Sequence, residues 1–346
     1  MVEPNWDAYP ETLPLLIVFT IFAIAIFAFC IKTRKEEKPL ERRITEISLG
    51  ILFLVTAFLF PPLVPTVMIL LINIVIIATS IFFALLLLTQ WLTVRKLREA
   101  GDSEALKQRD QDYFRQQFKA SFDDLKHDTA RKSLHLISPT VILVCVLIGK
   151  IAVNETVSLT LVLVLGSFFL LLFAFVDIIR LLKFEWVPPK ITGMFSKAMK
   201  EHEIGSFTAT FDMVLGLVPA VFFLPLSLVA AIGMVSALAD AAASIVGKRW
   251  GKHKFPKDGK KSVEGYIAGS AVAFVIGYVI VLIFGFLFTP TGTTADFLVP
   301  LAYAGVAALV FFVLDVLSLP LDDNVLNPLV ITFGFLPIWL LIGLPL

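Results

Sequence analysis

The chain of 346 residues is too apolar and too poor in charge for a soluble globular protein. Hydrophobic residues make up 58% of it and charged residues 16%, whereas soluble domains are nearer half apolar with about 25% charged residues. Its net charge is +1, and its two cysteines, Cys30 and Cys145, both lie in apolar runs. This excludes a disulfide framework and a cysteine-rich zinc site.

Apolar runs follow one another along most of the chain, and each is close to the roughly 20 residues that a transmembrane helix needs. Several of the short connections carry proline, which ends helices. The sequence therefore predicts an all-α, polytopic transmembrane helix bundle with about ten spans. These spans are 13–31, 44–60, 66–90, 133–149, 157–179, 207–223, 226–246, 264–288, 298–317 and 326–344.

Basic residues are confined to a few of the connections. Of the 29 Lys and Arg residues, all but Lys150 fall in segments 32–43, 91–132, 180–206 and 247–262. Because basic loops stay on the cytoplasmic side of a membrane protein, we expect these four segments to be cytoplasmic. With ten spans, both termini are then non-cytoplasmic.

The first 90 residues hold three predicted spans without a polar constellation, so we interpret 1–90 as accessory transmembrane helices. Residues 91–127 form a cytoplasmic segment in which apolar side chains recur at spacings of three, four and seven. This spacing predicts an amphipathic helix on the membrane surface. The side chains in question are Leu106, Tyr113, Phe114, Phe118, Phe122 and Leu125.

The spans 207–223 and 226–246 have an alternative reading. Residues 213–246 could form one long helix broken near Pro219 and Pro225. A single span would place the basic loop 247–262 outside the cell, against the positive-inside rule, so two spans are preferred.

Three polar groups lie where cytoplasmic loops meet spans in the middle of the chain. In the first, which holds Arg131, Lys132 and His135, Arg131 and His135 are four residues apart and share a helix face. These cations could equally be membrane anchors. The other two groups are Asp177 with Arg180, which could be a structural ion pair, and Glu203, which could belong to a solvated charge cluster.

The densest polar group lies around the loop 247–262. Asp240 and Ser244 share one face of a helix rich in small residues, and a carboxylate in such a helix is expensive unless it has a function. Glycines alternating with lysines suit phosphate oxygens. The alternative is close helix packing beside a basic loop. The residues after Ser244 are Gly247, Lys248, Gly251, Lys261, Ser262 and Glu264.

The last polar group follows the ninth predicted span. Asp315 precedes Asp322, Asp323 and Asn324. Adjacent carboxylates and an amide supply the oxygen ligands that Mg²⁺ prefers. A turn that caps a helix is the alternative.

Taken together and in this order, these groups resemble the integral-membrane CTP-dependent lipid kinases, a family that includes dolichol, phytol and CTP-dependent diacylglycerol kinases and is related to phosphatidate cytidylyltransferases. The resemblance covers residues 128–328, so 128–346 is interpreted as the catalytic transmembrane domain. Ala239 stands where the family usually has Gly, and Tyr266 where it usually has Ser. The matching residues are Arg131-Lys132-x-x-His135, Asp177-x-x-Arg180, Glu203, Asp240-x-Ala-Ala-Ser244-x-x-Gly247-x-x-x-Gly251, Lys261-Ser262-x-Glu264-Gly265 and Asp323-Asn324.

The resemblance implies transfer of the γ-phosphoryl group of CTP to a lipid alcohol of the polyprenol or dolichol type, with Mg²⁺, at the cytoplasmic membrane face. Phosphoryl transfer depends mainly on positioning and on neutralising the charge of a polyanion. The expected partners are the lipid alcohol, CTP and the membrane, and no nucleic acid. The implied catalytic residues are Asp240, Lys261, Glu264 and His135; the metal ligands are Asp240, Glu264, Asp323 and Asn324; the nucleotide or phosphate ligands are Arg131, Lys132, Ser244, Gly247, Lys248, Gly251, Lys261 and Ser262; and the further candidates are Asp177, Arg180 and Glu203.

Three alternatives remain open from the sequence. A phosphatidate cytidylyltransferase would use the same nucleotide and metal but attach cytidine to a lipid phosphate. A kinase of the same family could act on diacylglycerol, phytol or geranylgeraniol. A transporter is a distant third, because it would carry ionisable residues near the middle of the membrane rather than at helix ends.

Overall fold

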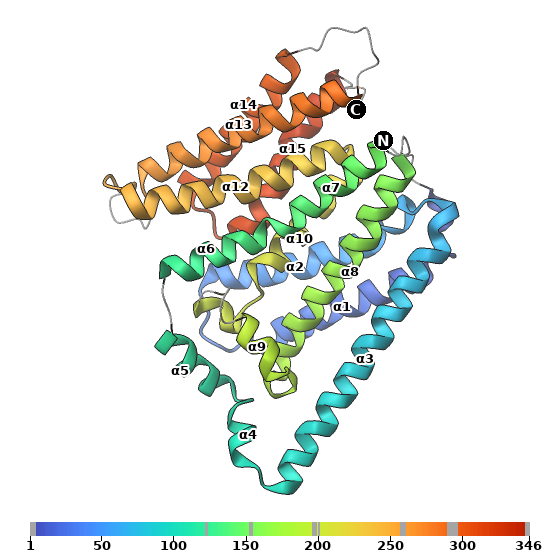
Figure 1. The fold of residues 1–346 in the computed structure, drawn as a ribbon, viewed down its shortest axis with the longest axis vertical. Helices are drawn as coiled ribbons and strands as arrows, with labels where there is room; N and C mark the ends of the chain where they lie inside the picture. Colours follow the sequence, from blue (N-terminus) through green and yellow to red (C-terminus); the bar gives the residue numbers. More distant parts are fainter. Residues whose placement is uncertain are drawn as a thin grey trace. The chain divides into compact units, whose positions relative to one another are not determined.

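The computed structural model describes residues 5–121, 124–151, 155–195, 199, 201–256, 261–288 and 297–342. These residues form α-helices and short 3-10 helices, the latter labelled η (Figure 1). In this described part of the chain, the only extended pairing is a single bridge between Lys254 and Ser262. The predicted all-α class is confirmed.

The helices group into two compact units, which we describe separately. The amino-terminal unit comprises Glu3–Leu134 and Leu163–Asp212, and the carboxy-terminal unit comprises His135–Val162 and Met213–Leu346. The bounds of these two units differ from the predicted regions 1–90, 91–127 and 128–346. The units reflect how the helices pack, and the three regions stay a prediction about function.

The amino-terminal unit is built around three long helices, α1, α2 and α3, together with most of α8 (Figure 1). Phe83 of α3 stacks on Phe175 of α8 with ring centroids 4.0 Å apart. Shorter helices follow α3 and α8 along the chain. The bounds are α1 Leu13–Lys32, α2 Leu40–Leu59, α3 Ile69–Ala100, α4 Ser103–Lys107, α5 Gln111–Ser121, α6 Asp124–His135, α8 Glu155–Leu182, η4 Phe184–Trp186, α9 Pro189–Phe195 and η5 Glu201–Gly205, with η1 Trp6–Ala8, η2 Pro61–Leu63 and η3 Thr66–Met68 near the start.

The carboxy-terminal unit is organised around α12. This helix contacts α7, α11, α13, α14 and α15, and the consecutive residues Leu228 to Ile232 are all fully buried. A helix that is apolar and covered on every side is the centre of a core. The bounds are α7 Ile137–Ile151, α10 Ala209–Gly216 (whose first turn belongs to the other unit), α11 Val218–Phe223, α12 Leu226–Trp250, α13 Val263–Phe288, α14 Leu298–Leu317 and α15 Asp323–Ile342.

Helix α3 is longer than the span 66–90 that the sequence predicts. It continues as a charged helix to Ala100 and ends at Gly101, whose φ of 68° closes the helix in the left-handed conformation that glycine adopts readily. The next helix, α4, is capped by Asp102, whose carboxylate accepts a hydrogen bond from the Ala105 N–H at 3.0 Å. Four charged residues (Arg95, Lys96, Arg98 and Glu99) interrupt the apolar run here, which is why a search for apolar runs ended the span too early.

Segment 91–127 is not one continuous helix, and its place on the membrane surface stays a prediction. The segment comprises the end of α3, then α4 and α5 and the start of α6. Phe118 of α5 is buried against Met199 and Ile204, with Phe114 packed beside it. Phe118 is therefore covered by protein, while Leu106, Tyr113 and Phe114 are partly exposed. The side chains of Phe122 and Leu125 lie outside the described residues.

Eight helical stretches of the described chain are long and apolar enough to cross a membrane, judged by length and composition. Helix α2 falls outside this group because its first two turns carry several charged residues, and Ala209–Phe223 is shorter and interrupted at Leu217. The count of about ten spans and the external termini stay predictions. The eight stretches are Leu13–Lys32, Thr66–Ala100, Thr129–Gly149, Thr156–Leu182, Leu226–Trp250, Val263–Gly285, Leu298–Leu317 and Asp323–Ile342.

Candidate functional site

The connection between α12 and α13 in the carboxy-terminal unit returns on itself. The Val263 N–H donates to the His253 carbonyl at 2.8 Å, and the Tyr266 hydroxyl donates to the Phe255 carbonyl at 2.5 Å. The Glu264 carboxylate accepts from the His253 N–H at 3.2 Å and lies 2.7 Å from His253 Nδ1. These contacts fix where the chain re-enters α13. Lys261 stands two residues before that helix.

Lys261 joins the end of α14 to the start of α15. Its Nζ lies 2.5 Å from Asp315 Oδ1 and 2.9 Å from Asp323 Oδ2. Asp315 lies in the last turn of α14, and Asp323 is the first residue of α15. The Lys261 ammonium therefore contacts two carboxylates that come from different helices. We call Lys261, Asp315 and Asp323 the lysine–aspartate cluster.

The protonated form of Lys261 is strongly favoured. Partial burial by itself lowers the pKa of this lysine, but the charges of Asp323 and Asp315 and the hydrogen bonds to them outweigh burial and raise the pKa above its ordinary value. A lysine in this state cannot act as a base near neutral pH. It can neutralise anionic oxygens.

The turn before α15 is a helix cap. Asp322 Oδ1 accepts from the backbone N–H of Asn324 at 2.8 Å and from the Asn324 side-chain amide at 2.6 Å. The alternative in which this turn caps a helix therefore holds for Asp322, whereas the Asp323 carboxylate faces Lys261. The side-chain amide of Asn324 donates within the cap, and its role as a metal ligand stays a prediction.

The glycines of the predicted phosphate-binding group lie where α12 crosses α13. A Cβ on Gly247 would lie 3.3 Å from Ser262 Oγ, a Cβ on Gly251 would overlap Ser262, and a Cβ on Gly265 would lie 2.8 Å from the Ala243 carbonyl oxygen. Small residues at such a crossing let two helix backbones approach closely. Ser262 is itself buried, and its hydroxyl accepts from the Gly265 N–H at 3.2 Å.

These contacts give Gly247, Gly251 and Ser262 a packing role. Binding of phosphate by the same residues stays a prediction.

Asp240 lies three residues before Ala243, whose atoms lie beside Gly265 and Gly269 of α13, and residues three and four apart share a helix face. Ser244 follows Asp240 by four residues and shares a helix face with it. Both side chains are partly buried, and Lys248, one turn further on, is exposed. Their place beside α13 is compatible with a site at this end of the helices.

The predicted metal ligands do not form a compact group in the part of the chain that the structure describes. No set of three His, Cys, Asp or Glu side chains there is arranged to hold a metal ion. Glu264 is engaged by His253, while Asp323 and Asp315 converge on the Lys261 ammonium. The two carboxylates that lie together are those of Asp315 and Asp323, and both face the Lys261 ammonium. Mg²⁺ prefers carboxylate oxygens as ligands.

In the amino-terminal unit, Arg180 and Asp177 form a buried clamp on the chain around η5. Arg180 donates to the carbonyls of Glu203 and Ile204 at 2.8 Å each and of Ser206 at 2.6 Å. Asp177 accepts from Arg180 Nη2 at 2.8 Å, and its other oxygen accepts from the Thr208 N–H at 2.8 Å. A buried pair so fully occupied by backbone groups favours the structural reading of these two residues.

Glu203 is the partner of a second arginine. Its carboxylate lies 3.7 Å from Arg131 Nη1, and both side chains are almost fully buried. Lys132 and His135, which follow Arg131 on α6, are buried as well. The structure therefore brings Arg131 and Glu203 together, and it gives the first polar group more burial than membrane anchors have.

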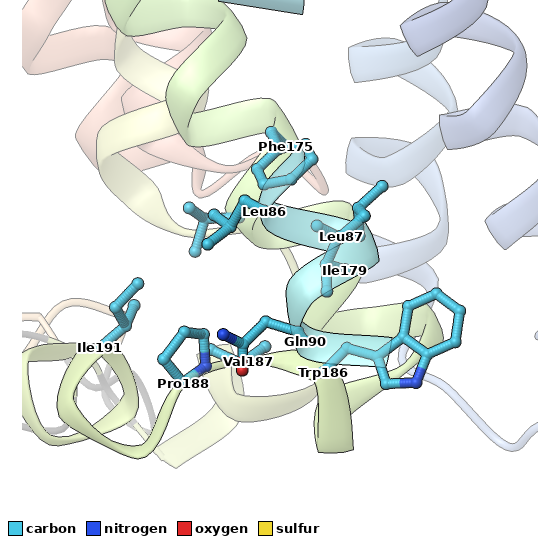
Figure 2. A pocket seen from close by; sticks show the side chains of 10 residues that line it. Leu86, Leu87, Gln90, Phe175, Ile179, Trp186, Val187, Pro188 and Ile191 are labelled. Atoms are coloured by element: carbon cyan, nitrogen blue, oxygen red, sulfur yellow. The ribbon is translucent and has the colours of Figure 1, made fainter. Parts of the chain in front are cut away.

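A small apolar pocket of about 20 Å³ lies between α3, α8 and the η4–α9 segment (Figure 2). Gln90 is its polar lining residue, and the Gln90 side-chain oxygen already accepts from Arg109 at 3.1 Å. Such a lining does not suit a phosphate, and the pocket is too small for a lipid chain. The other lining residues are Leu86, Leu87, Phe175, Val176, Ile179, Trp186, Val187, Pro188 and Ile191.

Two participants, Thr208 and His253, were not among the predicted site residues. Thr208 donates to Asp177 from 31 positions away, and His253 contacts Glu264 from 11 positions away. The basic loop around His253 was a signal for that residue, whereas nothing in the sequence pointed to Thr208.

Comparison with known proteins gives one partial similarity. The chain is 33% identical over 130 residues to a protein described as "Phytol kinase" from Synechocystis sp.. The match covers 37% of this chain and 54% of that kinase, so it spans about half the length of the curated relative. No protein-family model matches the chain, and no solved structure matches it.

Proposed function

We propose that this protein is a membrane-embedded lipid kinase that transfers the γ-phosphoryl group of CTP to an isoprenoid alcohol. The observation that carries the proposal is the lysine–aspartate cluster, in a chain that is similar over part of its length to a phytol kinase. The order of motifs along the sequence supports CTP as the donor.

The cluster has the chemistry that phosphoryl transfer requires. The Lys261 ammonium can pair with phosphate oxygens, which are stronger hydrogen-bond acceptors than most neutral groups. Its release from the carboxylates would leave Asp315 and Asp323 as oxygen donors at the same place. Mg²⁺ bound there would neutralise part of the charge of the triphosphate.

The remaining carboxylates are candidates for orienting the alcohol. Asp240 is partly buried on α12, at the side that faces α13. A carboxylate within reach of the hydroxyl would accept its proton as the new bond to phosphorus forms. Lys261 is excluded from that role because its pKa is raised.

The alcohol is an isoprenoid in this proposal, and phytol fits the partial match as well as a polyprenol or dolichol does. An isoprenoid alcohol has a small polar end and a long apolar chain, so the hydroxyl must be delivered from the bilayer.

The proposal is tested with purified protein in lipid bilayers, Mg²⁺, and either CTP or ATP. The lipid panel is phytol, geranylgeraniol, a polyprenol, dolichol and diacylglycerol. We expect phosphorylation of at least one isoprenoid alcohol with CTP and less with ATP. Failure to phosphorylate any alcohol with either nucleotide, by protein that is folded, would contradict the proposal.

A further inference from the structure

We infer that the connection between α12 and α13 binds the headgroups of anionic lipids at the surface of the bilayer. The binding surface consists of two aromatic and two basic side chains, which we call the aromatic–basic tip: Trp250, Lys252, Lys254 and Phe255. The tip is separate from the lysine–aspartate cluster and contains none of the predicted nucleotide ligands. The inference does not rest on the proposed kinase activity.

The two aromatic side chains of the tip are unusually open to the surroundings. Trp250, the last residue of α12, is 56% exposed, and Phe255 is 52% exposed. Exposed apolar surface that is bordered by polar residues marks a contact with another molecule or with a membrane. Aromatic rings together with lysines are typical of segments that lie at the boundary between headgroups and acyl chains.

The connection folds back beside the start of α13. The Tyr266 hydroxyl donates to the Phe255 carbonyl at 2.5 Å, and the Val263 N–H donates to the His253 carbonyl at 2.8 Å. Helix α13 is long and apolar enough to cross a membrane from Val263 onward. The backbone of Phe255 is therefore held next to the end of a candidate span, which is where lipid headgroups lie.

An exposed apolar stripe of α13 continues from the tip. Val263, Ile267, Ala271 and Val275 are four residues apart and all exposed, so they share one face of the helix. Other faces of α13 pack against α12 and α14. A lipid whose acyl chains lie along this stripe would have its headgroup beside the tip.

The charge of the connection selects for anionic headgroups. Lys252 and Lys254 are exposed, and segment 247–262 carries seven Lys or Arg residues against one acidic residue, Asp258. A lysine near an anionic membrane surface strengthens binding roughly fivefold. A soluble polyphosphate would be attracted by the same cations, but it would make no use of exposed aromatic rings beside a candidate span. The combination therefore favours a lipid.

The test measures lipid binding to the full-length protein in neutral detergent. The probes are fluorescent short-chain phosphatidylglycerol, which is anionic, and the matching phosphatidylcholine, which is not. The variants are the double substitution Lys252→Gln with Lys254→Gln, and the single substitution Phe255→Ser. The serine variant keeps the backbone carbonyl that accepts from Tyr266, so the connection should keep its fold.

The matched control is the double substitution Lys107→Gln with Lys190→Gln. These lysines are exposed and belong to the short helices α4 and α9, which are not among the candidate spans. The control removes the same charge as the Lys252 and Lys254 variant. All of these side chains are exposed, so the unfolding temperatures should stay close to that of the wild type.

We expect the Lys252 and Lys254 variant to bind phosphatidylglycerol roughly tenfold or more weakly, since two lysines near an anionic surface are lost. Its binding of phosphatidylcholine should be unchanged. Phe255→Ser should weaken binding of both lipids several-fold, because an apolar ring no longer leaves water on binding. The control should bind both lipids like the wild type, and salt should weaken only the binding of phosphatidylglycerol.

Wild-type protein that binds phosphatidylglycerol no more tightly than phosphatidylcholine would overturn the inference. Equal losses in the two double variants would overturn it as well, and so would Phe255→Ser protein that binds both lipids like the wild type. Inorganic pyrophosphate at constant ionic strength distinguishes the source of the anion. Phosphatidylglycerol binding that persists in excess pyrophosphate supports the inference, whereas displacement would assign the lysines to a soluble phosphate and overturn it.

Discussion

At the scale of single residues, Lys261 is the side chain on which the candidate active site depends. It is the one cation that contacts both Asp315 and Asp323 in the described structure, and both contacts are short. Lys261→Met should abolish phosphoryl transfer while folding and membrane insertion persist, because methionine keeps the side-chain length but removes the charge. The measurement is turnover with CTP, together with the unfolding temperature in detergent.

Arg249→Met is the matched control for Lys261. Arg249 belongs to the same basic stretch, is exposed, and lies over the Trp250 ring at 5.2 Å rather than in the cluster. It should cost little activity. Lys257, a second lysine expected to be dispensable, lies outside the described residues. Equal and small effects of Lys261→Met and Arg249→Met would mean that the loop is only a topogenic basic patch.

The pH dependence of turnover follows from the charge state of Lys261. Its pKa is raised, so the protonated form is present at low and neutral pH and is lost only above the ordinary lysine value of about 10.4. We expect no fall in kcat from this group between about pH 6 and pH 9. A basic limb that disappears in Lys261→Arg protein would contradict this assignment.

The Asp177–Arg180 clamp should matter for stability. Removing one partner of a buried ion pair costs about 3–5 kcal/mol, so Asp177→Asn should lower the unfolding temperature by several degrees. Glu99→Gln, which breaks an exposed pair with Arg95, should lower it hardly at all. An unchanged unfolding temperature of the Asp177 variant would show that the clamp does not hold η5 in place.

Sequence reasoning at this scale found residues but not their partners. Lys261 and Asp323 were both predicted as site residues, yet they are 62 positions apart and their contact depends on how α13, α14 and α15 pack. Asp177 and Arg180 could be paired from their spacing, because residues three apart share a helix face. The hydrogen bonds of Asp177 to Thr208 and of Arg180 to the η5 carbonyls could not be predicted.

At the scale of helices, the crossing of α12 and α13 sets the geometry of the loop that carries Lys261. Gly265→Ala would place a Cβ 2.8 Å from the Ala243 carbonyl oxygen, which is backbone and cannot rotate away. Overpacking of this kind costs about 1–3 kcal/mol, and the shift of α13 should also reduce turnover. The measurements are the unfolding temperature and kcat of the same preparation.

Gly305→Ala in α14 is the control for Gly265. A Cβ on Gly305 meets no atom within 4 Å, and alanine is the better helix former, so stability should be unchanged or higher. If both variants behaved alike, the close crossing of α12 and α13 would not be a determinant of the fold.

Most helices could be predicted from apolar runs, because the length of a membrane-spanning helix is fixed by the bilayer. The errors occurred where no such run exists. The charged last turns of α3 and the short helices α4 and α5 carry a weak apolar signal, and Phe114 and Phe118 looked like a lipid-facing stripe. Their burial against Met199 and Ile204 depends on a contact between distant segments.

At the scale of the whole molecule, the segregation of basic residues makes topology the property that is easiest to test. A reporter at Trp250, at the end of α12, should be cytoplasmic. A reporter at position 292, in the connection between α13 and α14 and outside the described residues, should be external. Both reporters on one side would mean that α13 does not cross the membrane, although its 26 mostly apolar residues are about 39 Å long.

The central claim is that this membrane protein transfers the γ-phosphoryl group of CTP to a lipid alcohol. The direct measurement is a double-label assay in which CTP carries one label on the γ-phosphate and another in cytidine, with the isoprenoid alcohols of the panel and phosphatidate offered in separate reactions. We predict that the γ-phosphate label enters the phosphate of at least one isoprenoid alcohol and that no cytidine label enters any lipid. Cytidine label in a lipid formed from phosphatidate, with no γ-phosphate transfer to an alcohol, would contradict the account.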